Sequence, residues 1–180
     1  MKKLSSLISV LAIAGAATTA SALDREGKLG LGFQETFSSS VAVSSPAANM
    51  GSWSVKYGMS PQANLQAVVG FNLGKDIGPK TFVVGARFLY DLVENENSDF
   101  YTGLGVLYNK PNSSVSTDAI RVNIPLGYEF SFAGLPEIGF NAEAGIAIDF
   151  AVEGNTKPIA FSSIGGNVGG NLGLGVHYYF

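Results

Sequence analysis

The chain has 180 residues, a length suited to one domain, and its net charge of −3 arises from 11 Lys and Arg against 14 Asp and Glu. This acidic balance excludes the basic patch that neutralises nucleic acid phosphates. The chain contains no cysteine, which excludes disulfides, thiolate chemistry and a cysteine-linked lipid anchor. Glycine is abundant at 23 residues and most aromatics are Phe or Tyr, which is typical of a β-rich protein.

Residues 1–22 have the features of a signal peptide. Lys2 and Lys3 form a positive start, and an apolar stretch follows from Leu4 to Ala17. Ala20-Ser21-Ala22 then gives the small-x-small pattern that precedes cleavage. The apolar stretch is shorter than the roughly 20 residues that a transmembrane helix needs. We therefore predict cleavage after Ala22, export of the protein, and a single mature domain over residues 23–180.

After the signal peptide, apolar residues recur at every second position, which is the period of a β-strand. The clearest case begins at Ile120, where Ile, Val, Leu, Tyr and Phe alternate with polar residues and glycine as far as Phe132. No stretch of the mature chain approaches 18 continuous apolar residues, so helical membrane spans are not expected. The alternation predicts eight strands, at residues 28–37, 51–60, 65–73, 82–90, 100–108, 120–132, 138–148 and 168–180.

Charged residues fall on the face of these strands that lies opposite the apolar face. A soluble barrel turns its apolar face inward, whereas a barrel in lipid turns it outward and pairs the charges inside its lumen. The two arrangements give the same sequence pattern, and the predicted export signal and the closing aromatic residue favour the barrel in lipid. Glycines on the inward face would leave room for long side chains. The predicted lumen ion-pair cluster comprises Lys56, Arg87, Arg121, Glu129, Glu143 and Asp149.

The connections between the predicted strands alternate in length. Long or polar connections, rich in Ser, Asn, Gly and Pro, are expected at residues 38–50, 74–79, 109–118 and 151–165. Short connections are expected at 61–64, 93–99 and 133–137. Small outer-membrane barrels have long extracellular loops and short periplasmic turns. The pattern thus predicts an up-and-down topology with both termini in the periplasm.

The last predicted strand ends in Tyr178-Tyr179-Phe180, with Tyr178 and Phe180 on its apolar face. An aromatic residue at the end of a terminal strand resembles the C-terminal assembly signal of bacterial outer-membrane β-barrels. The mature chain as a whole resembles the small eight-stranded outer-membrane barrels of the OmpA-domain and OmpX type. The connection at 74–79 is shorter than the protruding sheet of OmpX-like adhesins would need.

This resemblance implies an all-β fold, an eight-stranded antiparallel up-and-down transmembrane β-barrel in the cell outer membrane. It also implies a monomer surrounded by outer-membrane lipid and lipopolysaccharide, with a lumen closed by ion pairs. Tyr178 and Phe180 would be the assembly signal that the barrel assembly machinery reads. Members of these families have structural or adhesive roles and share no catalytic site.

The residues themselves give little indication of catalysis. His177 is the only histidine, and a catalytic role would need a serine or an acid beside it, for which Glu129 is the nearest candidate. A single histidine without cysteine does not predict a metal site. Glu143 and Asp149 lie six residues apart on one strand, which separates them by about 20 Å. This distance is too long for two carboxylates that act as a catalytic acid–base pair. We expect no cofactor and no enzymatic activity.

Three functions remain open from the sequence. The first is a structural or surface-interacting outer-membrane barrel with a polar, ion-paired lumen. The second is a narrow, porin-like channel for small solutes, in which the lumen charges would act as a gate. The third, which the residues support least, is an outer-membrane enzyme that modifies lipids.

Overall fold

The computed structural model describes residues 25–36, 50–71, 80–112, 118–152, 159–164 and 173–180. The predicted signal peptide 1–22 lies outside these residues, as do the connection predicted at 74–79, nearly all of the one at 38–50, and parts of those at 109–118 and 151–165. Within the described part of the chain, no helix is long and apolar enough to cross a membrane. The strands are β1 (Leu29–Thr36), β2 (Met50–Ser60), β3 (Ala63–Phe71), β4 (Lys80–Asn95), β5 (Ser98–Asn112), β6 (Ala119–Phe132), β7 (Leu135–Ala151), β8 (Ile159–Ile164) and β9 (Gly173–Tyr179).

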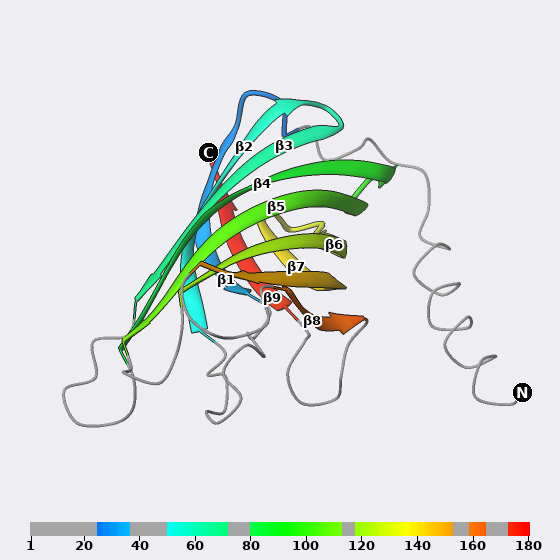
Figure 1. The fold of residues 1–180 in the computed structure, drawn as a ribbon. Coiled ribbons are helices and arrows are strands. Elements are labelled where there is room, and N and C mark those ends of the chain that lie inside the picture. The colour runs from blue at the N-terminus through cyan, green and yellow to red at the C-terminus, as the bar shows by residue number, and fades with distance from the viewer. Residues whose placement is uncertain (1–24, 37–49, 72–79, 113–117, 153–158, 165–172) are drawn as a thin grey trace, which may run out of the picture.

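The strands form one closed antiparallel barrel (Figure 1). Neighbours in sequence pair from β1 through β7, and β1 closes the barrel by pairing with β9. β9 pairs with the first part of β7, and β8 pairs with its last part, so β8 and β9 share the eighth position. The predicted all-β, eight-stranded, antiparallel barrel is confirmed.

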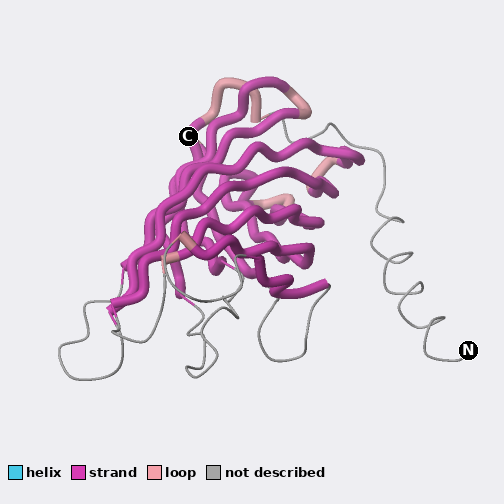
Figure 2. The backbone as a smooth tube through the Cα atoms, viewed as in Figure 1, coloured by secondary structure: helices cyan, strands magenta, loops and turns pink. Residues whose placement is uncertain are grey.

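The described turns are shorter than the predicted connections. Pro61–Gln62, Glu96–Asn97 and Ala133–Gly134 each join two strands directly. They lie at one end of the barrel, together with the C-terminal Phe180, and are drawn in pink in Figure 2. We call this the turn end. The strands are longer than the segments in which apolar residues alternate. Backbone pairing continues where the side chains have become polar, as between Glu94 and Asp99.

Two of the predicted long connections contain longer stretches of strand, which corrects the sequence prediction. β8 lies within the connection predicted at 151–165, and β5 continues to Asn112 into the connection predicted at 109–118. The physical reason is the length of their neighbours. β7 extends to Ala151, and β8 pairs with the part of β7 that β9 does not reach. Without β8, that part of β7 would present unpaired backbone groups along one edge.

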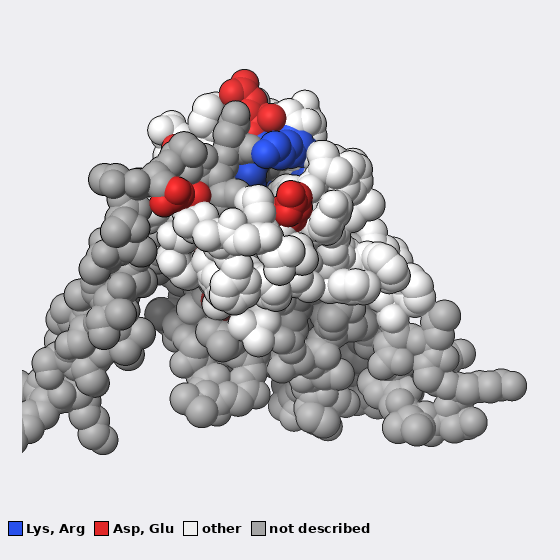
Figure 3. Space-filling model, turned by 180° about the vertical axis from the view of Figure 1, so that it is seen from behind, with Lys and Arg blue, Asp and Glu red and all other residues white. Residues whose placement is uncertain are grey.

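The barrel has most of its large apolar side chains outside and most of its polar side chains inside, apart from a small buried cluster of Val68, Val83 and Leu107. Trp53 is 62% exposed on the outer face of β2, whereas Lys56 on the same strand is 2% exposed in the lumen. Figure 3 shows charged residues gathered at the turn end, above a belt of uncharged side chains. The most exposed large apolar residues come from many strands: Trp53, Met59, Phe71, Leu104, Phe132, Leu174, Tyr178 and Phe180.

Candidate functional site

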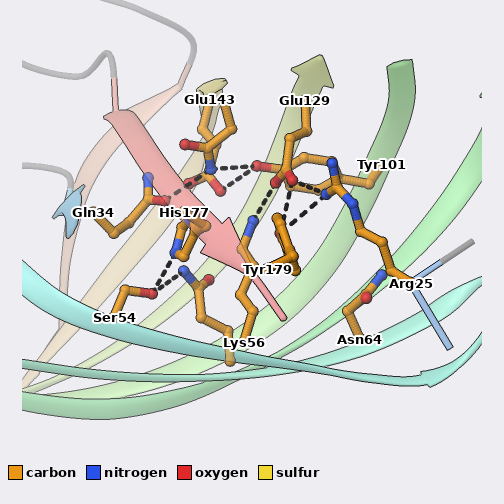
Figure 4. Close-up of polar contacts among 12 residues, drawn as sticks. Arg25, Gln34, Ser54, Lys56, Asn64, Tyr101, Glu129, Glu143, His177 and Tyr179 are labelled. Atoms are coloured by element: carbon orange, nitrogen blue, oxygen red, sulfur yellow. Dashed lines mark hydrogen bonds and ion pairs between the residues drawn. The ribbon is translucent and has the colours of Figure 1, made fainter. Parts of the chain in front are cut away.

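The candidate site is the polar interior of the barrel, and its first centre is the carboxylate of Glu129 on β6. Lys56 from β2 places its Nζ 2.5 Å from Glu129 Oε2. Tyr179 on β9 donates its hydroxyl to Glu129 Oε1 at 2.7 Å. The guanidinium of Arg25, which precedes β1, forms an ion pair with the same oxygen (Figure 4). Two cations from the β1–β2 side of the barrel, across the lumen from β6, thus neutralise Glu129, and burial of a carboxylate requires such neutralisation.

The second centre is the ion pair of Arg87 on β4 and Glu143 on β7. Arg87 Nη2 lies 2.7 Å from Glu143 Oε2, and both side chains are 1% exposed. The hydroxyl of Tyr101 donates to Glu143 Oε1 at 2.6 Å. Asn141 Nδ2 in turn donates to Tyr101 at 3.0 Å and to Gln34 Oε1 at 2.8 Å. These bonds join four strands by side chains alone, in addition to the backbone ladders.

A third group surrounds His177 on β9. Its Nε2 lies 2.8 Å from Ser54 Oγ, and Gln66 Nε2 donates to the same hydroxyl at 2.7 Å. His177 Nδ1 is buried, and no described residue forms a hydrogen bond with it. A Ser–His pair in an acyl-transfer enzyme needs an acid on the other ring nitrogen to orient the imidazole. No described residue supplies that acid, and both residues are 2% exposed or less, so the described contacts do not form a catalytic triad.

Two inward glycines leave room for tyrosine side chains in the lumen. A Cβ on Gly127 would lie 2.3 Å from the Tyr101 ring, and one on Gly30 would lie 2.6 Å from the Tyr179 ring. Any side chain at these positions would displace the tyrosines, which reach beyond the adjacent strand to their carboxylate partners. Glycine on the lumen face was expected to make room for long side chains, and here it makes room for tyrosines.

The six residues of the predicted ion-pair cluster are distributed along the lumen. Lys56, Arg87, Glu129 and Glu143 are buried and form the two ion pairs described above. Arg121 is also buried, at 6% exposure, but it lies eight residues before Glu129 on β6, roughly 27 Å along an extended strand. The backbone of Asp149 lies opposite that of Arg121, and its side chain is outside the description. The structure thus describes two ion pairs among four of the six residues, and the inclusion of Arg121 and Asp149 in the cluster stays a prediction.

Sequence reasoning missed several members of the network. The inward positions of Gln34, Tyr101, His177 and Tyr179 follow from alternation, so the strand pattern could have found them. No sequence pattern predicts the inward position of Arg25, because this residue precedes the first strand and enters the lumen mouth through the turn at Gly27.

The lumen near Glu129 holds a cavity of about 10 Å³, enough for about one water molecule. Among the described residues, no group of three or more His, Cys, Asp or Glu could hold a metal ion. The described interior thus suits a structural network or a path for water and small ions better than a site for an organic ligand.

Comparisons with known proteins address the fold. No protein-family model matches the chain, and no curated protein sequence matches it. The structure is similar to the crystal structure of the N-terminal β-barrel domain of Pseudomonas aeruginosa OprF, with a TM-score of 0.54 and 17% sequence identity. The match covers 86% of this chain and 98% of that domain. The chain has the fold of the OprF barrel domain. The resemblance to small eight-stranded barrels is thus confirmed at the level of the fold.

The predicted assembly residues lie at the seam of this OprF-like barrel. Tyr178 and Phe180 point outward, at 53% and 61% exposure, and their ring centroids are 6.2 Å apart. Phe180 exchanges two backbone hydrogen bonds with Leu29, of 3.0 and 3.1 Å, where the last strand meets the first. Their position at the closure of the barrel fits the predicted role, which stays a prediction.

Proposed function

We propose that the protein is a non-enzymatic outer-membrane β-barrel with a structural or surface-interacting role and a closed, ion-paired lumen. The observation that carries the proposal is the reversed distribution of polarity in a closed barrel. Large apolar side chains are exposed on the outer face, and the ion pairs of Glu129 and Glu143 are buried inside. In water this arrangement would expose a large apolar surface, whereas in a bilayer it places lipid against the apolar belt.

The same proposal includes the location and the partners. The protein is exported through a cleaved signal peptide, residues 1–22, and inserted as a monomer by the barrel assembly machinery. Phospholipid and lipopolysaccharide then surround the belt. The support is the export pattern in the sequence, the aromatic residues at the end of β9, and the apolar outer face.

A narrow, porin-like channel is the second candidate, because the lumen lining contains buried polar atoms that have no hydrogen-bond partner in the described part of the chain. These include Ser52 Oγ, Gln66 Oε1, Asn123 Oδ1 and His177 Nδ1. Buried polar atoms of this kind are usually satisfied by water, and a hydrated lumen is the first requirement for ion passage.

Two measurements test the proposal. Fractionation of cells that express the full chain should place it in the outer membrane, as a barrel whose gel mobility changes on heating. In planar bilayers the purified protein should show little or no steady ion conductance. A soluble periplasmic product would refute the membrane assignment. A large, steady conductance would reject the closed lumen and favour the channel.

A further inference from the structure

An open pocket of about 350 Å³ lies at the turn end, where the outer face of the barrel meets the turns. One side of it is the end of the β4–β5 hairpin, residues 95–98, and the other side is formed by Tyr128, Phe130 and Ser131 near the end of β6. β5 and β6 are neighbours in the barrel (Figure 1), and Ser98 pairs with Phe130. The volume falls within the range of about 300–1,000 Å³ that is typical of sites for small molecules.

The β6 side of the pocket is an aromatic wall. The rings of Tyr128 and Phe130 are stacked, with centroids 6.1 Å apart and an angle of 25° between their planes. Phe140 on β7 also stacks on Phe130, at 5.6 Å, and Phe132 meets Phe130 edge-on at 5.7 Å. Three neighbouring rings thus hold Phe130 in place. The face of an aromatic ring attracts a cationic group, such as an ammonium, that lies within about 6 Å of the ring centre.

The hairpin side of the pocket supplies one charge, the carboxylate of Glu96. Within the described part of the chain, no residue forms a hydrogen bond or an ion pair with this carboxylate. None of the described residues that line the pocket is a lysine or an arginine. In the sequence from 88 to 109 all charged residues are acids, namely Asp91, Glu94, Glu96 and Asp99. The pocket therefore repels an anionic group, and a carboxylate opposite an aromatic wall favours an ammonium group.

An apolar row leads away from the pocket along the outer face of β6. Beyond Tyr128 the outward residues are Leu126 and Ile124, which are 48% and 43% exposed. On β5, next to this row, the outward residue Leu104 is 54% exposed. These residues belong to the apolar outer face that the proposed function places in the bilayer. A molecule that fills the pocket and follows this row has a cationic group at one end and a long apolar chain at the other.

We propose that this pocket binds the headgroup of a phospholipid that carries a primary ammonium group, such as phosphatidylethanolamine. The ammonium donates to Glu96 and lies against the Tyr128 ring, and the acyl chains run along Leu126 and Ile124. The headgroup has no net charge, so the acidic hairpin does not repel it as it repels an anionic lipid. The proposal rests on the proposed function, because the lipid reaches the pocket only where the apolar outer face lies in a bilayer.

Competition between lipids tests the site. The purified protein in detergent is mixed with phosphatidylethanolamine, phosphatidylglycerol and phosphatidylcholine that have identical acyl chains, and the bound lipids are counted by native mass spectrometry. An ammonium held by one carboxylate and one aromatic ring should favour the ethanolamine lipid over the glycerol lipid about tenfold. Glu96→Gln and Tyr128→Leu should each reduce this preference about threefold or more.

Two matched variants serve as controls. Glu137→Gln removes a carboxylate that is exposed at the same end of the barrel but does not line the pocket. Tyr57→Leu removes a tyrosine that is 46% exposed on the outer face of β2, across the barrel from β6. Both should keep the wild-type preference. Glu96→Gln preserves the size of the side chain in a turn outside the backbone ladder, so this variant decides the outcome where Tyr128→Leu lowers the yield of folded barrel.

Equal binding of the three lipids by the wild type would overturn the proposal, as would an unchanged preference in Glu96→Gln or an equal loss in Glu137→Gln. Phosphatidylcholine bound as strongly as phosphatidylethanolamine would overturn the primary ammonium, because a quaternary ammonium has no N–H to donate. Release of the bound lipid by millimolar phosphoethanolamine would overturn the part assigned to the acyl chains. A protein that fractionates with the outer membrane but prefers no lipid keeps the proposed function and loses only this site.

Discussion

Replacing Arg87 with alanine should destabilise the barrel strongly, because it leaves a buried carboxylate without its cation. Arg87 and Glu143 are each 1% exposed and lie 2.7 Å apart. After the substitution, Glu143 would keep one neutral donor, the hydroxyl of Tyr101 at 2.6 Å. A carboxylate held by one phenol in a low-dielectric interior is not compensated. Breaking a buried pair in this way costs about 3–5 kcal/mol of unfolding free energy.

Two further variants distinguish the loss of the ion pair from a nonspecific loss of stability. Arg87→Met combined with Glu143→Leu removes both charges and fills similar volumes, so its stability should return to within about 1 kcal/mol of the wild type or exceed it. Lys110→Ala breaks a pair at the surface, where Nζ lies 3.9 Å from Asp118 and the lysine side chain is 62% exposed. That change should cost between about 0 and 1 kcal/mol.

Urea unfolding of the barrel in phospholipid vesicles measures these differences. The fluorescence of Trp53, the single tryptophan and an outward residue, reports on the transfer between lipid and water. If the unfolding free energy of Arg87→Ala lies within about 1 kcal/mol of the wild-type value, then the burial of Glu143 does not depend on that ion pair. The account of the lumen as a network of obligatory partners would then be wrong.

The remaining predictions concern assembly, orientation and one hydrogen bond. Deleting Phe180 should leave the protein in the periplasm or degraded, and normal amounts of heat-modifiable barrel in the outer membrane would contradict its role as an assembly signal. On intact cells an impermeant maleimide should label Lys110→Cys and not Glu137→Cys, and the opposite pattern would invert the barrel. Tyr101→Phe removes a donor to Glu143 and should lower the unfolding free energy by about 1–3 kcal/mol in the same urea titration, so an unchanged midpoint would show that water replaces the hydroxyl.

The direction of each side chain was predictable from the sequence, because a strand turns successive residues to opposite faces. That Trp53 and Lys56 lie on opposite faces follows from this rule alone, whereas the prediction that Trp53 lies outside also needed the export signal and the closing aromatic residue. The choice of partners was not predictable, because it depends on the stagger between strands. Lys56 contacts Glu129, which lies 73 residues further along the chain, and only the cumulative register of the intervening strands brings the two together.

Two features lay outside what alternation can reveal. β8 has the sequence Ile-Ala-Phe-Ser-Ser-Ile, in which apolar residues do not keep to one parity, and it pairs with β7 across a register shift between Ala147 and Ile148. Arg25 stands before any strand, and its position depends on the left-handed backbone at Gly27. In both cases the position of the residues depends on an irregular backbone, which an analysis of two-residue periodicity cannot detect.

The ion pairs connect walls of the barrel that share no backbone hydrogen bonds. In the closed order β2 and β6 stand on opposite sides, and the contact from Lys56 to Glu129 crosses the full diameter. The pair from Arg87 on β4 to Glu143 on β7 crosses in a second direction. Backbone ladders alone resist the separation of neighbouring strands but leave the cross-section free to flatten and the strands free to shear. Cross-braces in two directions hold the barrel round, and slippage of any one strand by a residue would carry its charge onto the apolar outer face.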